Sequence, residues 1–214
     1  MGRTAPQTNA LPRRGAPKGV ITMDRYYWLH LASFAWIAFL AYWVFSARKL
    51  KSIKRREPSA ERIVYLVFML ATYLVMFNEQ IDFGPLGKRF VPPLPAIGAL
   101  GVAITVIGVA FAIWARWHLG ENWSATVTVK KGHELIRSGP YGRIRHPIYT
   151  GMLVGLAGTA LALGEYRGLL SLGMAVACSF VKARKEERYL VQEFGAGFKE
   201  HAEQTGMFLP KLTP

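Results

Sequence analysis

Cysteine is almost missing from this chain of 214 residues, which contains a single one, Cys178. One cysteine excludes an intrachain disulfide and a metal site built from several cysteine ligands. Because Cys178 lies inside an apolar run, we interpret it as a small packing residue. We therefore expect any catalytic or binding site to be built from other side chains.

Acidic residues are also scarce. The sequence contains 13 Asp and Glu residues against 27 Lys and Arg residues, which gives a formal net charge of +14. No nucleic-acid-binding motif accompanies this charge, and the basic residues flank apolar runs. We therefore expect these residues to contact anionic lipid headgroups, and we expect no nucleic acid partner.

Residues 1–22 lack hydrophobic periodicity and are rich in Ala, Pro, Arg and Gly. This composition predicts a disordered basic tail. The apolar run that follows is longer than that of a signal peptide and ends in a polybasic segment. We therefore interpret that run as a first membrane span.

Long apolar runs make up most of the remaining sequence. Residues 26–47 and 96–117 are each long enough to cross about 30 Å of hydrocarbon. Shorter runs occupy residues 63–77, 148–163 and 168–181. Aromatic residues at both ends of the first run suit the two membrane interfaces. We therefore predict an all-α fold, a multi-pass transmembrane helical bundle with about five spans.

The distribution of Lys and Arg predicts how these spans are oriented. Residues 48–62 are strongly basic, so the positive-inside rule places them in the cytoplasm, with the N-terminus outside and the C-terminus inside. Residues 23–95 then hold the first two spans, and residues 96–214 form a core with a charged amphipathic helix at 182–200. The polar loop at 78–82 matches no metal-ligand spacing, so we predict a solvated loop and no metal site.

Polar residues concentrate in one stretch, Lys130–Gly151, which reads KKGHELIRSGPYGRIRHPIYTG. Pro140 and Pro147 fix φ and push the preceding residues out of the helical region, which predicts an ordered connection rather than a helix. Pro147 suits the first turn of the apolar helix that follows. Because helix N-termini attract anions, we predict a ligand site here, on the cytoplasmic face.

Each side chain in this pattern has a simpler explanation when it is taken alone. His146 could be an interfacial turn residue, and Tyr141 and Tyr149 could be packing or interfacial residues. Glu186 and Glu187 stand among Lys and Arg residues and could form a solvated helix face with i,i+4 ion pairs. Only the combined pattern favours a site.

That combined pattern resembles a known family. GHELIRSGPYGRIRHPIYTG, followed one helical hairpin later by KARKEERYLVQEFG, is similar to the isoprenylcysteine carboxyl methyltransferase and phospholipid methyltransferase superfamily of integral membrane enzymes. The resemblance covers residues 114–210, and the first two spans carry no comparable motif. It implies that the polar connection and the start of the C-terminal helix bind S-adenosylmethionine, which becomes S-adenosylhomocysteine.

Carried over residue by residue, the resemblance implies cofactor contacts from three parts of the chain. These are His133, Glu134, Leu135 and Ile136 in the first segment, Tyr141, His146, Pro147, Ile148 and Tyr149 in the second, and Glu186 beyond the hairpin. In this assignment Tyr141 contacts the adenosine side of the cofactor. Glu186 is the carboxylate that can pair with the cofactor's ammonium.

The resemblance also implies residues that act on the substrate. A family arginine that orients a substrate carboxylate corresponds here to Lys182, a point charge rather than a bidentate fork, and Arg184 is nearby. Methyl transfer is an in-line displacement that mainly needs alignment and exclusion of water. A carboxylate acceptor is ionised at neutral pH and needs no general base. An amine or thiol would lose a proton, for which His146 or Glu187 could serve.

We therefore predict an integral membrane methyltransferase with a lipophilic acceptor. A prenylcysteine-type carboxylate is favoured over a phospholipid amine or a small thiol. Two other classes stay open. Sterol reductases contain an HPxY-like segment in a similar helical arrangement and use NADPH, although this chain is short for that group. A non-enzymatic membrane binding protein could also retain the fold.

Overall fold

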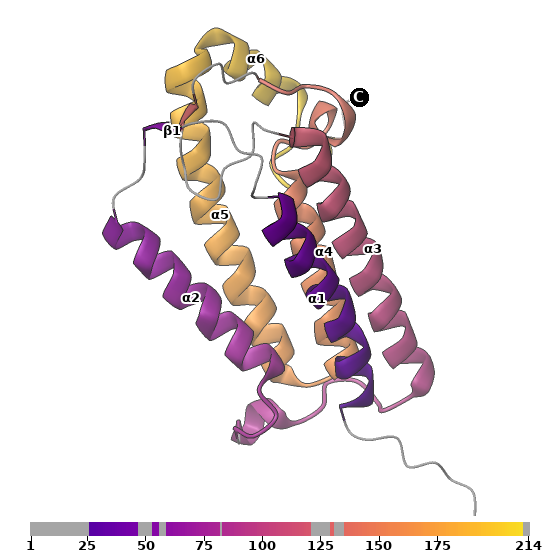
Figure 1. Ribbon diagram of the computed structural model, residues 1–214. Coiled ribbons are helices and arrows are strands. Elements are labelled where there is room, and N and C mark those ends of the chain that lie inside the picture. Colours follow the sequence, from indigo (N-terminus) through magenta and orange to yellow (C-terminus); the bar gives the residue numbers. More distant parts are fainter. Residues whose placement is uncertain are drawn as a thin grey trace, which may run out of the picture.

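The computed structural model describes residues 26–46, 53–55, 59–81, 83–120, 129–130 and 135–211. The basic tail predicted at residues 1–22 lies outside the described residues. Helices dominate the architecture (Figure 1).

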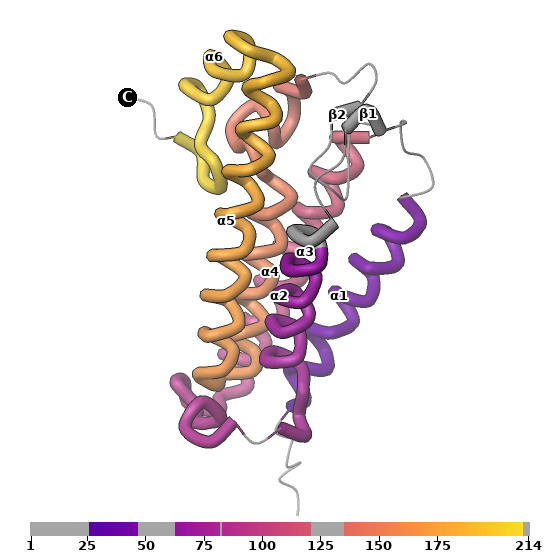
Figure 2. Tube along the Cα trace, turned by 90° about the vertical axis from the view of Figure 1, so that its left-hand side faces the viewer, coloured from indigo at the N-terminus to yellow at the C-terminus, as the bar shows by residue number. Residues whose placement is uncertain are grey.

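Five long helices form a bundle: α1 (Tyr27–Ser46), α2 (Ser59–Phe77), α3 (Pro95–Leu119), α4 (Pro147–Leu163) and α5 (Tyr166–Phe194). The short elements are the 3-10 turns η1 (Gly84–Gly87) and η3 (Gly139–Gly142), the antiparallel strands β1 (Ile53–Arg55) and β2 (Val129–Lys130), and the helix α6 (Ala196–Gln204). Figures 1 and 2 show the long helices running lengthwise, with α6 across one end of the bundle and η1 at the other. The predicted helical fold is confirmed; the small strand pair was not predicted.

The outer surface of the bundle is apolar. Helices α1 and α3 are long and apolar enough to cross a membrane, and α4 and residues 63–77 of α2 are shorter apolar helices. Large apolar side chains such as Phe34, Val67 and Ile107 remain 67%, 61% and 64% exposed. Apolar surfaces of this extent suit a lipid environment rather than water. The number of spans, expected to be five, stays a prediction.

Helices α3 and α4 pack backbone against backbone. A Cβ atom added to Gly151 would lie 2.6 Å from the backbone nitrogen of Ala112 and 2.6 Å from the carbonyl oxygen of Gly108. Gly101 and Gly158 meet backbone atoms of the opposite helix in the same way. Small residues permit this close approach between helices. This closely packed pair of helices forms the core that carries the site.

Helix α5 is longer than expected. It runs without a break from Tyr166 to Phe194 and ends at Gly195, which has a φ of +53°. The span predicted at 168–181 and the charged residues after it therefore belong to one helix, which corrects the prediction of a separate helix at 182–200. No Gly or Pro lies between residues 174 and 194, so the change in polarity does not interrupt the backbone.

At the end of the bundle opposite α6, a buried ion pair fastens the turn between α4 and α5. Arg167 Nε lies 2.6 Å from Glu165 Oε2, and both side chains are 1% exposed. Arg167 also donates hydrogen bonds to the carbonyl oxygens of Val75 at 3.3 Å and Asn78 at 2.5 Å, at the end of α2. The turn and α2 are therefore held together by a single guanidinium group.

Candidate active site

The site begins where the polar connection enters α4. Gly139 has a φ of +57°, which favours glycine, and a Cβ there would lie 2.7 Å from the ring of His118 on α3. The His118 Nε2 atom is 2.9 Å from the Ser138 hydroxyl, which fixes the connection against α3. Pro147 is the first residue of α4, so His146 lies just outside the helix.

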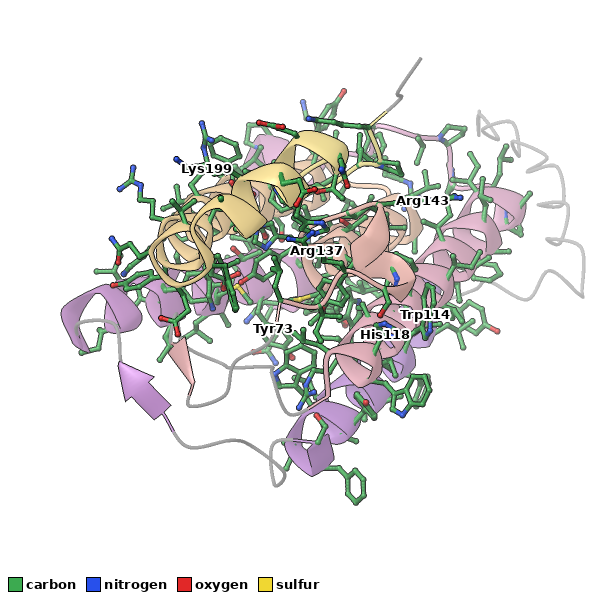
Figure 3. All side chains as sticks on the ribbon, turned by 90° about the horizontal axis from the view of Figure 1, so that it is seen from above. Tyr73, Trp114, His118, Arg137, Arg143 and Lys199 are labelled. Atoms are coloured by element: carbon green, nitrogen blue, oxygen red, sulfur yellow. The ribbon has the colours of Figure 1, made fainter. Side chains whose placement is uncertain are left out.

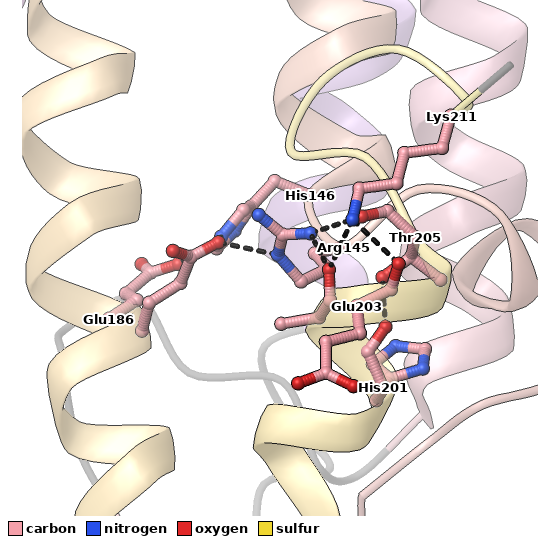
Figure 4. A network of polar contacts seen from close by, with 9 residues as sticks. Arg145, His146, Glu186, His201, Glu203, Thr205 and Lys211 are labelled. Atoms are coloured by element: carbon pink, nitrogen blue, oxygen red, sulfur yellow. Dashed lines mark hydrogen bonds and ion pairs between the residues drawn. The ribbon is translucent and has the colours of Figure 1, made fainter. Parts of the chain in front are cut away.

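His146 bridges the two adjacent glutamates of α5. Its Nδ1 atom is 3.4 Å from Glu186 Oε2, and its Nε2 atom is 3.4 Å from Glu187 Oε1. The Tyr149 hydroxyl donates a hydrogen bond of 2.6 Å to Glu186 Oε1, and its ring stacks on that of His146 with centroids 5.6 Å apart. Figure 4 shows His146 and Glu186 facing each other between the connection and α5. Two segments far apart in sequence thus form one polar cluster.

This cluster has a defined charge distribution. Burial lowers the pKa of His146, but Glu186 and Glu187 outweigh burial and raise it above its ordinary value. Burial raises the pKa of Glu186, but His146 and Lys182 outweigh burial and lower it. The pKa of Glu187 is lowered as well, because His146 and Arg145 outweigh burial there. Both glutamates are therefore ionised at neutral pH, and His146 binds its proton more tightly than a free histidine does.

Arg145 connects the cluster to the end of α6. Its Nε atom is 2.6 Å from Glu187 Oε1, and the two side chains are 12% and 13% exposed. Its Nη1 atom donates to the carbonyl oxygens of Ala202, at 3.2 Å, and of Thr205 (Figure 4). Glu187 is therefore held by Arg145 as well as by His146.

A hydrophobic cluster lies beside the polar one. Tyr141 and Ile148 are buried together with Ala115 of α3, and Ile136 packs against them. The Tyr141 hydroxyl lies 3.4 Å from the carbonyl oxygen of Ala115. Three residues that the resemblance assigns to the cofactor thus converge on one apolar wall.

The two basic residues predicted to act on the substrate take different positions. The Lys182 Nζ atom lies 4.1 Å from the ring centroid of Tyr65 on α2, and its charge acts on Glu186. Arg184 is exposed, and its guanidinium lies 5.5 Å from the ring of Phe180 on the same helix. Only Lys182 is therefore brought close to the cluster.

The first cofactor segment is described only in part. His133 and Glu134 lie outside the described residues, and Leu135 is half-buried. The roles given to these three residues stay predictions.

The sequence reasoning missed the segment that follows α6. The backbone N–H groups of Arg145 and His146 donate to the carbonyl oxygens of Gly206 and Met207, at 2.9 and 3.0 Å. These two amides at the entry to α4 therefore have carbonyl partners, although the sequence favoured an anion there. Gly206 marks a turn after α6, but no local signal in the sequence identifies its partner.

Basic side chains surround this end of the bundle. Figure 3 looks onto the end that carries α6 and labels Arg137, Arg143 and Lys199 there. Arg137 forms an exposed ion pair with Glu200 at 3.3 Å and donates to the carbonyl oxygen of Gly197 at 2.6 Å. A basic rim at this level suits anionic lipid headgroups. Contact with such headgroups stays a prediction.

Comparisons with known proteins find a family that is similar to this part of the chain. The profile of the phospholipid methyltransferase family matches residues 97–197, a range that contains His146, Glu186 and Glu187. The chain is 32% identical over 97 residues to protein-S-isoprenylcysteine O-methyltransferase of Schizosaccharomyces pombe, covering 44% of this chain and 41% of that protein. It is 25% identical over 149 residues to protein-S-isoprenylcysteine O-methyltransferase B of Arabidopsis thaliana, covering 68% and 73%.

A bacterial relative has a different kind of name. The cobalt-zinc-cadmium resistance protein CzcN of Cupriavidus metallidurans is 29% identical over 168 residues, covering 78% of this chain and 70% of that protein. Within the described part of the chain, no three His, Cys, Asp or Glu side chains gather as a metal site would require. The family profile, the relatives from Schizosaccharomyces pombe and Arabidopsis thaliana and the motif around His146 all indicate a methyltransferase. Residues 97–197 are therefore similar to the phospholipid methyltransferase family, and the chain resembles protein-S-isoprenylcysteine O-methyltransferases.

Proposed function

We propose that this protein transfers a methyl group from S-adenosylmethionine to a lipophilic acceptor, with a prenylcysteine-type carboxylate as the favoured acceptor class. The observation that carries the proposal is the placement of His146 between Glu186 and Glu187, with Tyr149 bonded to Glu186. In this proposal the bundle is multi-pass, and the cluster lies at its cytoplasmic face.

The described residues fit the cofactor chemically. The Glu186 side chain is 24% exposed, against 13% for Glu187 and 6% for His146, so Glu186 is the most accessible charge of the cluster. Its carboxylate would pair with the cofactor's ammonium, and the wall of Ile136, Tyr141 and Ile148 would contact its apolar parts. When bound, the cofactor supplies an electrophilic methyl group on a sulfonium.

The charges of the cluster favour an acceptor that is already ionised. The raised pKa of His146 favours the protonated imidazole, and a protonated imidazole has no lone pair with which to accept a proton. Glu187 has a lowered pKa and is paired with Arg145 at 2.6 Å, so it is a weak base. Neither candidate general base is suited to deprotonate an amine or a thiol. A carboxylate needs no such base, and Lys182 is close enough to Glu186 to attract an anionic acceptor toward the cluster.

The cofactor assignment is tested by titrating purified protein with S-adenosylmethionine in detergent by calorimetry. We expect Glu186→Ala to weaken binding at least about tenfold, because the bound ammonium loses its counter-charge. Glu193→Ala is the matched control, since it makes the same change two turns further along α5 at an exposed position. The melting temperature of each variant is measured beside the titration, so that loss of binding is distinguished from loss of folding. Unchanged affinity in Glu186→Ala, or wild-type binding of NADPH instead, would contradict the proposal.

The acceptor is tested with cofactor labelled in its methyl group and a farnesylcysteine analogue as substrate. We expect labelled product that base releases as methanol, because a methyl ester hydrolyses in base whereas methylated amines and thioethers do not. The rate should not climb between about pH 7 and 8.5, since a carboxylate is ionised throughout that range. A base-stable product and a rising rate would instead indicate an amine or thiol acceptor.

A further inference from the structure

We propose that residues 205–211, which follow α6, are a positioning element of the candidate active site, and that Phe208 fixes the rings of His146 and Tyr149 toward Glu186. The proposal rests on the proposed function for one of its readouts, cofactor affinity. The 205–211 segment lies beyond residues 97–197, which match the family profile, so the match itself assigns it no role.

The 205–211 segment is joined to the site along its backbone. Arg145 and His146 donate their N–H groups to Gly206 and Met207, and the Gly206 N–H group donates to the Arg143 carbonyl oxygen at 3.1 Å. Phe208 continues the contact, because its carbonyl oxygen accepts a 2.7 Å hydrogen bond from the Thr150 hydroxyl. The segment thus follows the chain from the polar connection into the first turn of α4.

Two cations hold the segment at the end of α6. The Lys211 Nζ atom donates to the carbonyl oxygens of Ala202 at 3.2 Å and Glu203 at 2.6 Å, and Arg145 donates to Ala202 and Thr205 (Figure 4). Cations near the last carbonyl groups of a helix stabilise its C-terminus. Because Arg145 also binds Glu187, the segment and the cluster share one guanidinium group.

Phe208 lies against the two rings that contact Glu186. Its ring centroid is 6.1 Å from that of His146 and 6.4 Å from that of Tyr149, and the latter pair is T-shaped. His146 and Tyr149 stack on each other with an interplanar angle of 17°. Aromatic contacts of this kind have a preferred geometry, so Phe208 restricts how both rings can turn. The positions of His146 Nδ1 and the Tyr149 hydroxyl against Glu186 follow from that restriction.

The turn that brings Phe208 back toward α4 requires glycine at residue 206. A Cβ atom on Gly206 would collide with the carbonyl oxygen of Leu209, and it would lie 3.2 Å from the Lys211 backbone nitrogen. Any side chain at Gly206 must therefore open the turn. This provides a variant that displaces the segment without altering any polar side chain of the site.

The first experiment needs no ligand. Hydrogen exchange of the Arg145 and His146 amides is measured by mass spectrometry with single-residue fragmentation, on the whole protein in lipid nanodiscs. We expect Gly206→Ala to speed exchange at both amides at least about tenfold, because their carbonyl partners move away. Leu209→Ala, at a neighbouring side chain that is 72% exposed, should leave both rates unchanged. Unchanged rates in Gly206→Ala would overturn the backbone part of the proposal.

The second experiment measures the affinity for S-adenosylmethionine. We expect Phe208→Ala and Phe208→Leu to weaken binding about tenfold, and Phe208→Tyr to stay near wild type, because the ring and not only apolar volume is needed. Rescue by leucine would indicate a merely structural role and would overturn the positioning assignment. If wild-type protein bound no S-adenosylmethionine, the proposed function would fail. The positioning role would then be decided by the ¹⁵N shifts of His146 in apo protein, which must change in Phe208→Ala and Phe208→Leu but not in Phe208→Tyr.

Discussion

His146 is a histidine with two acidic neighbours and little contact with water. Its Nδ1 and Nε2 atoms each face a carboxylate at 3.4 Å, and its side chain is 6% exposed. Nε2 makes no hydrogen bond to any described residue, so the contact with Glu187 is electrostatic rather than a directed bond. The contacts of such a buried group, and those of its charged neighbours, depend on whether the group is protonated.

The stability of the protein should therefore depend on pH through this cluster. The raised pKa of His146 gives a contribution that is complete below about 6.5, the unfolded value, and is lost as pH rises through the folded value. The lowered pKa values of Glu186 and Glu187 give a contribution that is present above about 4.3 and lost as pH falls through their folded values. We expect His146→Gln to flatten the decline of the melting temperature above about pH 6.5. Melting curves across pH in detergent measure this, and parallel curves for variant and wild type would contradict it.

At the level of single residues, the sequence indicated which side chains come together in the candidate site. His146, Tyr149 and Glu186 belong to motifs with fixed spacing, and the structure brings them together. Phe208 belongs to no such motif, and its contact with His146 spans 62 residues of sequence, 208 − 146. Arg145 lies within the motif, but its binding to Glu187 and to α6 depends on where those elements pack. Contacts set by tertiary packing leave no local signal in one sequence.

Among the elements, α3 and α4 form the most closely packed pair. Small residues at helical spacing in a sequence indicate such a contact, because they allow two backbones to approach. The extent of α5 was not recognisable in the same way, because a change from apolar to charged residues resembles the start of a new helix. Helix ends follow backbone breakers such as Gly195 rather than polarity.

A methyl group added at the contact between α3 and α4 should lower the stability of the protein. We expect Gly151→Ala to destabilise the protein by about 1–3 kcal/mol or more, because the added Cβ must displace backbone atoms of α3 rather than a flexible side chain. Gly173→Ala on α5 is the control, since a Cβ there meets nothing within 4 Å. That change should be neutral or stabilise by about 0.5–1 kcal/mol. Thermal unfolding in detergent distinguishes the two, and equal melting temperatures would contradict the packing argument.

The ion pair at the turn between α4 and α5 gives a second test of how the helices are held together. Arg167→Met should destabilise by about 3–5 kcal/mol, because it removes the guanidinium ion pair of the buried Glu165 carboxylate. The double variant Glu165→Gln with Arg167→Met should recover part of this loss, since the carboxylate that lost its ion pair is also removed. Unfolding of both variants is measured in the same detergent. A double variant no more stable than Arg167→Met would argue against the ion pair as the cause.

For the whole molecule, the arrangement of charge predicts the orientation in the membrane. The end with α6 carries Arg137, Arg143 and Lys199, and the opposite end contains η1. With Cys178 replaced by alanine, Lys199→Cys and Leu86→Cys place single thiols at exposed positions near the two ends. We expect an impermeant maleimide to label Leu86→Cys from outside intact cells and Lys199→Cys only after lysis. Labelling of both from the same side would contradict the five-span prediction.

The direct contact between the backbones of α3 and α4 also affects how the bundle can deform. Because glycines bring the two backbones together, little side-chain volume lies between α3 and α4, and the two helices should move as one rigid unit. Helix α2 lies against α5 and makes no comparable contact with α1 in the part of the chain that the structure describes (Figure 1). Movement of one helix relative to the others should therefore be largest for α2. Spin labels on α2 and α3 should report a broad range of separations, whereas a pair on α3 and α4 should report a narrow one.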